Sequence, residues 1–228
     1  MSGALLNITS EGEVKLLTDE ADGVKFKIPD GVDIAMDGMI YFTDASYKYN
    51  LTDVLLDIWG GQPHGRLLSY DPTTKQTKVL VDDLYFANGV VVSPDQSHVI
   101  FCETPKKRCK KYYIQGEKKG SVETFIDPLP GMPDNIRYDG EGHYWIALPV
   151  PAMPAWDLAV RYPFTRKVLG IMEKYTVIPM YRGERWHFGE LTEVSSAIRI
   201  GNHIFGGSLH NPYILSFDIQ EYPAIDVA

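Results

Sequence analysis

At three points in the chain an acid or amide side chain directly precedes a predicted innermost strand. These points are Pro29-Asp30, Ala87-Asn88 and Pro133-Asp134-Asn135. Hard divalent cations such as Ca²⁺ and Mg²⁺ prefer carboxylate and amide oxygens as ligands. Asp30, Asn88, Asp134 and Asn135 therefore form a candidate site for a divalent cation, preferably Ca²⁺, if the fold brings them together. The alternative is that Asp and Asn precede these strands only because they are good turn formers.

An internal repeat gives a reason to expect such convergence. One strand–turn–strand pattern occurs at residues 31–42, 89–101 and 135–146, and in a shorter form at 196–205. Each copy has alternating apolar residues on both sides of a turn rich in Gly, Asp or Asn, which is typical of a β-hairpin. Further strand pairs are predicted at 65–81 and 111–126. One unit thus has four strands in about 45–60 residues, the size of a propeller blade.

The sequence therefore predicts an all-β chain that forms one partial β-propeller domain over residues 1–228. Equivalent positions in successive blades lie at equivalent places around the axis, so the polar residues should meet at one mouth of the ring. The repeats amount to about four blades, and an open ring would leave strand edges uncovered. The segment near 154–177 breaks the pattern with the spacing of one or two amphipathic helices. We expect these helices to pack over a face of the propeller.

Composition limits the class of partner. The net charge of −8 offers no basic surface to a nucleic acid, and no apolar run is long enough to span a bilayer. The first residues lack the features of a signal peptide. No Gly-x-Ser-x-Gly motif is present, and the six histidines show no spacing typical of zinc ligands. A small-molecule substrate is expected, and a bound cation would suit hydrolysis of an ester or lactone.

Two further features bear on the cellular compartment. Asn7 and Asn50 each begin a glycosylation sequon, although chance sequons are common. Cys102 and Cys109 flank a predicted turn that contains a proline. They could face each other as a cross-strand disulfide, or remain as two reduced thiols.

Several stretches resemble the strictosidine synthase-like family of plants. These stretches are residues 44–49, 65–75, 85–90, 101–105, 133–140 and 198–208. The resemblance implies a six-bladed propeller that enters the secretory pathway and resides in the vacuole or endoplasmic reticulum, often glycosylated. It thereby favours glycosylation at Asn7 and Asn50 and the Cys102–Cys109 disulfide.

The resemblance extends to a wider superfamily that includes paraoxonases, gluconolactonases, regucalcin and adipocyte plasma membrane-associated protein. Paraoxonases, gluconolactonases and regucalcin bind a divalent metal at the propeller channel. Asn88 and Asp134 match their ligand positions by motif. Asn135 matches the second residue of the paraoxonase Asp-Asn pair.

The sequence departs from the family pattern in three places. The signal segment and first blade of the family are expected to be absent, and strands are expected to be missing after Tyr175. The family's catalytic glutamate falls on Ser195 or Ser196. Serine has no side-chain ionisation that suits deprotonation of an amine near neutral pH. Glu193 lies two or three residues along the strand, and we do not assign the role to it.

Three functions remain in competition. The first is a metal-dependent hydrolase of esters or lactones, inactive if the chain is truncated. The second is a strictosidine synthase-type lyase that condenses an amine with an aldehyde in alkaloid biosynthesis, against which the missing glutamate argues. The third is a non-catalytic binding protein. The sequence favours the first.

Overall fold

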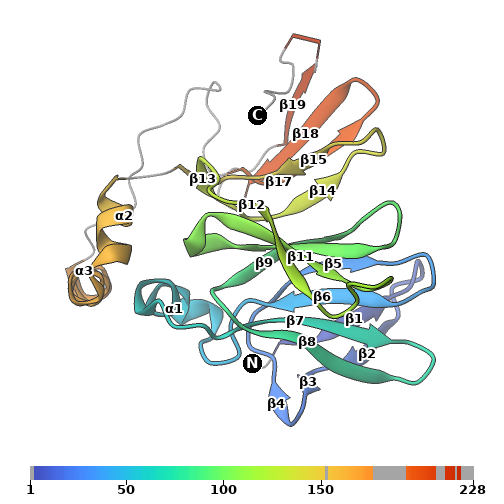
Figure 1. The fold of residues 1–228 in the computed structure, drawn as a ribbon, viewed down its shortest axis with the longest axis horizontal. Coiled ribbons are helices and arrows are strands. Elements are labelled where there is room, and N and C mark those ends of the chain that lie inside the picture. Colours follow the sequence, from blue (N-terminus) through green and yellow to red (C-terminus); the bar gives the residue numbers. More distant parts are fainter. Residues whose placement is uncertain (1–2, 152–153, 177–193, 209–213, 219, 222–228) are drawn as a thin grey trace.

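The computed structural model describes residues 3–151, 154–176, 194–208, 214–218 and 220–221. Within them, short antiparallel strands form sheets that lie face to face and follow one another in chain order (Figure 1). The all-β prediction is confirmed for this part of the chain.

Two of the sheets have four strands each in simple up-and-down order. The first sheet contains β5 (Pro29–Ile34), β6 (Ile40–Asp44), β7 (Gly65–Asp71) and β8 (Gln76–Leu84). The second contains β9 (Ala87–Val92), β10 (His98–Glu103), β11 (Arg108–Tyr113) and β12 (Val122–Ile126). These are the predicted four-strand units, and β5 and β9 are their innermost strands (Figure 1).

The other sheets are smaller. After the second sheet come β14 (Ile136–Tyr138) with β15 (Tyr144–Ile146), β13 (Gly131–Met132) with β16 (Val150–Pro151), and β17 (Val194–Ile200) with β18 (His203–Ser208) and β19 (Leu215–Asp218). Before the first sheet come β1 (Leu5–Ile8) with β2 (Val14–Thr18), and β3 (Glu20–Ala21) with β4 (Val24–Lys25). The four predicted copies of the hairpin correspond to β5–β6, β9–β10, β14–β15 and β17–β18, so the repeat is confirmed.

The core lies between neighbouring sheets. Strand β9 illustrates how this arises, because Val90 and Val92 pack against the first sheet while Val91 packs toward Ile136 of β14. Successive side chains of a strand point to opposite faces, so a strand covered on both faces becomes a continuous apolar run. Burial of each such side chain stabilises the fold by about 1.5–3 kcal/mol.

Helices gather on one side of the sheets (Figure 1). They are η1 (Leu51–Asp53), α1 (Val54–Gly60), η2 (Thr104–Lys106), α2 (Pro154–Arg161) and α3 (Pro163–Thr176). The prediction for 154–177 is confirmed by α2 and α3, and α1 is an addition to it. Trp59 of α1 packs on Trp156 of α2 with ring centroids 4.9 Å apart, and Arg166 of α3 donates to the Gly60 carbonyl at 3.1 Å. No helix in the described ranges is long and apolar enough to cross a membrane.

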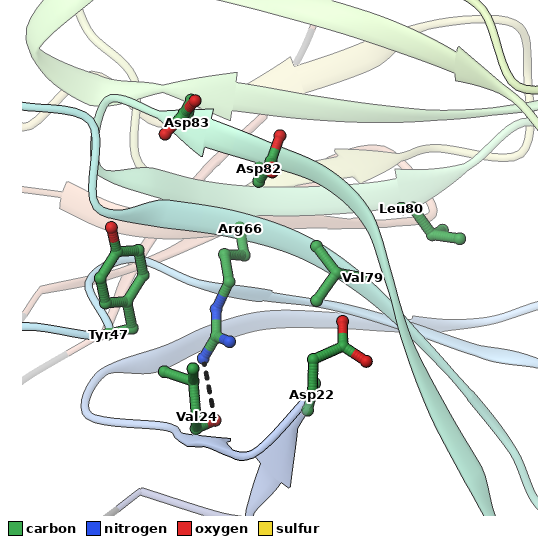
Figure 2. Close-up of a pocket in the computed structure, with 9 residues that line it drawn as sticks. Asp22, Val24, Tyr47, Arg66, Val79, Leu80, Asp82 and Asp83 are labelled. Atoms are coloured by element: carbon green, nitrogen blue, oxygen red, sulfur yellow. Dashed lines mark hydrogen bonds between the residues drawn. The ribbon is translucent and has the colours of Figure 1, made fainter.

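The Cys102 and Cys109 side chains are paired. These residues face each other across β10 and β11, are fully buried, and are joined as a disulfide. Both sequon asparagines are exposed, Asn7 on β1 and Asn50 just before η1. A pocket lies between the β3–β4 hairpin and strands β7 and β8 (Figure 2).

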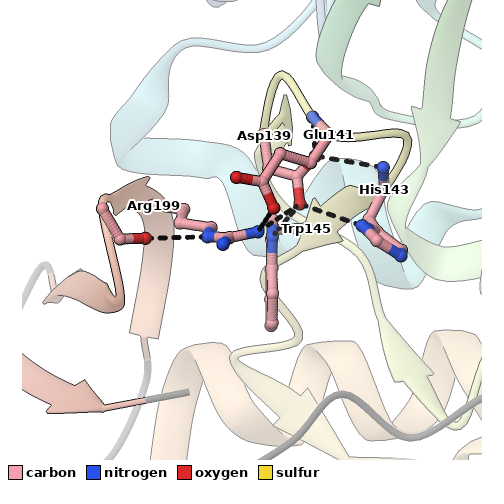
Figure 3. Close-up of polar contacts among 6 residues, drawn as sticks. Asp139, Glu141, His143, Trp145 and Arg199 are labelled. Atoms are coloured by element: carbon pink, nitrogen blue, oxygen red, sulfur yellow. Dashed lines mark hydrogen bonds and ion pairs between the residues drawn. The ribbon is translucent and has the colours of Figure 1, made fainter. Parts of the chain in front are cut away.

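A polar cluster links the third hairpin to β17 (Figure 3). The Asp139 carboxylate, in the β14–β15 turn, accepts hydrogen bonds from the backbone N–H groups of Glu141 and His143 at 2.8 and 3.0 Å. His143 Nδ1 lies 3.1 Å away, and Arg199 Nη1 of β17 lies 3.4 Å from the same carboxylate and 2.5 Å from Glu141. Burial opposes ionisation of Asp139, but the backbone N–H groups of Glu141 and His143, together with the Trp145 and His143 side chains, outweigh it and lower its pKa to about 2. The cluster thus ties two neighbouring hairpins together through one ionised carboxylate.

We expect Asp139→Asn to lower the free energy of unfolding at pH 7 by about 1–2 kcal/mol. The lowered pKa of Asp139 means that the folded protein stabilises its ionised form, and asparagine cannot ionise. That contribution is present above the unfolded-state pKa near 4 and is lost as the pH falls toward 2. Urea titrations at pH 7 and pH 2.5 measure it, and the difference between the two proteins should shrink at the lower pH. The control is Asp37→Asn, since Asp37 occupies the equivalent turn of the first sheet and, in the part of the chain that the structure describes, accepts only from the Met39 N–H. Equal losses from both substitutions would contradict a linking role for Asp139.

Candidate functional site

The innermost strands of successive sheets approach each other closely. Gly89 N of β9 donates to the Asp134 carbonyl at 3.1 Å, and Asn135 N donates to the Ser195 carbonyl of β17 at 3.3 Å. A Cβ atom added to Gly31 of β5 would lie 2.7 Å from Val90 N. The backbones at the starts of β5, β9, β14 and β17 are therefore in direct contact, in chain order.

Two buried threonines fix the spacing between these strands. Thr43 Oγ1 donates to the Asn88 carbonyl at 2.6 Å and accepts the Gly31 N–H at 3.0 Å. Thr104 Oγ1 donates to the Pro133 carbonyl at 2.8 Å and accepts from Asn88 Nδ2 at 3.2 Å. Each threonine thus ties one sheet to the innermost strand of the next, and together they hold Asn88 in place.

Asn88 carries an unsatisfied acceptor. The residue is 5% exposed, and its Oδ1 atom has no hydrogen-bond partner among the described residues. A buried polar atom without a partner costs about 1–3 kcal/mol, so native structures seldom leave one in place without a ligand. A cation bound beside Asn88 Oδ1 would remove this cost.

Asp30 and Asp134 have carboxyl groups that resist ionisation. Burial raises the pKa of Asp134 to about 6, and the Asn88 side chain opposes this change. Burial also raises the pKa of Asp30 to about 7, and the negative charge of Asp134 adds to it. Asp30 is nevertheless exposed to solvent. Water reaches its side chain, but the surrounding protein atoms displace part of its hydration shell, and this partial loss of water raises the pKa. The effect of the Asp134 charge on Asp30 indicates that the two carboxyl groups are near neighbours.

Asn135 has a different part in the arrangement. Its Nδ2 donates to the Ser195 carbonyl at 2.9 Å and to Asp134 Oδ1 at 3.3 Å. The amide thereby orients Asp134 and links β17 to the site. No point in the described ranges gathers three or more His, Cys, Asp or Glu side chains, so any cation here would need amide oxygens as well as the two carboxylates.

The two serines lie at the start of β17, next to Asn135. Ser195 is half-buried, and among the described residues its Oγ contacts the Gly207 carbonyl alone, at 3.5 Å. Neither Ser195 nor Ser196 supplies a carboxylate at this edge of the site. Glu193 lies outside the described residues.

The structure also pairs Asp57 with His64, which the sequence did not predict. Asp57 Oδ1 lies 2.5 Å from His64 Nδ1, and the His64 ring is flanked edge-on by Tyr47 and Tyr49. Burial raises the pKa of Asp57, while the contact with His64 opposes that change. This pair lies in the connection between β6 and β7, at the same end of the first sheet as Asp30. No spacing motif in the sequence predicts this pair, because α1 has to fold before Asp57 and His64 can meet. The one sequence signal for that helix is its end at Gly60-Gly61.

Residues 30–117 match the family model described as strictosidine synthase. The chain is 51% identical over 235 residues to protein STRICTOSIDINE SYNTHASE-LIKE 6 of Arabidopsis thaliana, covering 96% of this chain and 62% of that protein. It is 32% identical to adipocyte plasma membrane-associated protein of Gallus gallus, covering 92% and 57%. The predicted resemblance to the strictosidine synthase-like family is confirmed. The chain spans about three fifths of the length of these strictosidine synthase-like and adipocyte relatives.

Solved structures confirm the propeller fold. The nidogen–laminin complex gives a TM-score of 0.61 at 13% identity, covering 98% of this chain and 70% of that one. A gluconolactonase of Xanthomonas campestris gives 0.51 at 18% identity, covering 64% and 49%. At these identities the likeness concerns the fold alone, and the strictosidine synthase-like chain needs its own evidence for chemistry.

Proposed function

We propose that this strictosidine synthase-like chain carries the site of a metal-dependent hydrolase that acts on ester- or lactone-type small molecules. The observation that carries the proposal is the buried, unpartnered Oδ1 of Asn88 beside two carboxyl groups of raised pKa. A divalent cation, preferably Ca²⁺, would be held by Asn88, Asp134 and Asp30. When bound, it supplies Lewis-acid polarisation of a carbonyl oxygen.

The chain's own residues set the protonation requirement of the site. Asp134 and Asp30 must both be ionised to hold a cation, and their pKa values of about 6 and 7 place that condition near neutral pH. Asn135 supports it by donating to Asp134, which favours the ionised form. The buried threonines keep the strands from spreading when the two negative charges repel.

The alternative hypothesis, a strictosidine synthase-type lyase, receives no support from the described site. Condensation of an amine with an aldehyde needs a group that removes a proton from the amine, and Ser195 and Ser196 are neutral alcohols at the family's glutamate position. An enzymatic assay with an amine and an aldehyde would overturn this argument if product formed.

The test of the proposed function is turnover of phenyl acetate and of a small lactone with and without Ca²⁺. We expect chelation by EDTA to reduce turnover at least tenfold and added Ca²⁺ to restore it. Turnover unchanged by EDTA would refute the metal-dependent hydrolase. Binding of Ca²⁺ without any turnover would instead favour a non-catalytic binding protein.

We also propose that the protein resides in the secretory pathway, in the vacuole or endoplasmic reticulum. The Cys102–Cys109 disulfide supports an oxidising compartment, and the exposed Asn7 and Asn50 are open to glycosylation. Protein isolated from its native host should therefore gain electrophoretic mobility after enzymatic removal of N-glycans. Unchanged mobility would contradict glycosylation of the sequons.

A further inference from the structure

A pocket apart from the Asn88 site opens beside the first sheet (Figure 2). Its walls come from the β3–β4 hairpin, from β7 and β8, and from Tyr47. Its volume of about 520 Å³ falls in the range of sites for small molecules. None of its lining residues belongs to the candidate metal site.

Arg66 is the buried cation of this pocket. It is 4% exposed, and its guanidinium lies between the rings of Phe26 and Tyr47, 5.5 and 5.3 Å from their centroids. Its Nη2 donates to Asp44 at 2.7 Å and faces the Val24 carbonyl at 3.5 Å. The Nε atom is buried without a partner in the described part of the chain. The head group points into the pocket and retains donors that a ligand carboxylate could accept from (Figure 2).

Three carboxylates occupy other parts of the same pocket. Asp22, Asp82 and Asp83 are exposed, and within the described ranges none of them has an ion pair or a side-chain hydrogen bond. Asp44 already neutralises Arg66, so these three leave the pocket with an excess of negative charge. Such an excess favours an ammonium group in the ligand.

Apolar side chains complete the wall. Val24 is 41% exposed, and half-buried Val79 lines the same pocket, while Leu80 points away from both (Figure 2). An aliphatic group placed here would remove this surface from water, which favours binding.

We propose that this pocket binds a small zwitterion of the amino-acid type with an aliphatic side chain. Its carboxylate accepts from Arg66, and its side chain packs on Val24 and Val79. Its ammonium lies near Asp22, and Asp82 and Asp83 add negative charge from the other side of β8 (Figure 2). The proposal goes beyond the hydrolase site, because it needs neither the cation nor any residue of the Asn88 cluster.

Calorimetric titration with three related probes tests the two charged contacts separately. L-Leucine carries both charges, N-acetyl-L-leucine only the carboxylate, and L-leucine methyl ester only the ammonium. We expect leucine to bind best and each derivative to bind at least tenfold more weakly, with leucine binding unchanged by EDTA. Equal affinity for all three probes, or no binding of leucine at millimolar concentration, would overturn the proposal. The EDTA arm separates its failure from failure of the hydrolase.

Variants assign the contacts to residues. Combined replacement of Asp22, Asp82 and Asp83 by Asn should weaken leucine and its ester at least tenfold and leave N-acetyl-leucine unchanged. Glu117→Gln, an exposed carboxylate of the β11–β12 connection, is the control and should change nothing. Arg66→Lys keeps the charge beside Asp44 and should weaken leucine and N-acetyl-leucine only. If Arg66→Lys does not fold, the combined aspartate-to-asparagine variant still tests the proposal. Leucine affinity equal to that of the wild type in that variant would refute the site.

Discussion

Replacing Gly89 by alanine is expected to abolish stable folding, with a loss of more than about 4 kcal/mol in the free energy of unfolding. A Cβ atom at this position would lie 2.5 Å from the Asp134 carbonyl oxygen and 2.7 Å from Ile136 N. Both are backbone atoms at the start of β14, and they cannot move aside as the tip of a side chain can. The hydrogen bond from Gly89 N to Asp134 would be lost with the contact. Soluble yield and the midpoint of urea unfolding measure the effect.

Gly60→Ala is the matched control. A Cβ atom at Gly60 meets nothing within 4 Å, and the residue lies in α1, where alanine is the better helix former by up to about 1 kcal/mol. This variant should be as stable as the parent or slightly more so. A Gly89→Ala protein with the melting behaviour of the parent would show that the innermost strands do not approach as closely as described.

The hairpins could be predicted from sequence because local pattern and pairing coincide in them. Asp37 and Gly38 mark the first turn, Gly38 adopts a left-handed φ of +87°, and Val32 then pairs with Phe42. The repeat phase predicted Asp30 and Asn88 directly before their innermost strands, and the structure corrects this, because strand pairing already begins at Pro29 and Ala87. Asp30 and Asn88 are each the second residue of an innermost strand.

The contacts that complete the site could not be predicted in the same way. Thr43 acts on Asn88, 45 residues away, and Thr104 acts on Pro133, 29 residues away. Each threonine sits in an ordinary strand or turn, and only the stacking of one sheet on the next reveals its partner. A period-2 pattern reports which face of a strand is apolar, and it says nothing about which atom of a neighbouring sheet that face will meet.

The contact between Asp57 and His64 could not be predicted from the sequence for a related reason. Helix α1 has seven residues and is too short to be stable on its own propensity. It is held by packing of Trp59 on Trp156, which is almost a hundred positions further along the chain. Without knowledge of that contact, the segment is typical of a loop, and the Gly60-Gly61 pair alone does not indicate that it folds back to bring Asp57 onto His64.

The second large effect concerns calcium. We expect Ca²⁺ at about 100 times its dissociation constant to stabilise the parent by about 2.7 kcal/mol, which for a chain of this size raises the melting temperature by about 5–10 °C. Asp134→Asn should remove this shift, because it deletes one of the two carboxylates and leaves Asn88 Oδ1 without a cation. Asp37→Asn, an exposed carboxylate at the opposite end of the sheet that holds Asp30, should keep it. Differential scanning fluorimetry with and without Ca²⁺ is sufficient to decide.

The pH dependence provides an independent check whose sign follows from the raised pKa values. In the metal-free protein, Asp30 and Asp134 bind protons more tightly than in the unfolded chain, whose carboxyl pKa is near 4. Their contribution to stability is therefore fully present below pH 4 and is lost as the pH rises through about 6 to 7. Asp30→Asn removes one of these groups, so it should raise the melting temperature of the metal-free protein at pH 8. Calcium should reverse the order at that pH, because it stabilises the paired carboxylates of the parent and binds more weakly to the variant, whose amide oxygen carries no charge. A variant less stable than the parent at pH 8 in EDTA would mean that Asp30 and Asp134 do not repel each other at one site, and the argument for a cation there would fail.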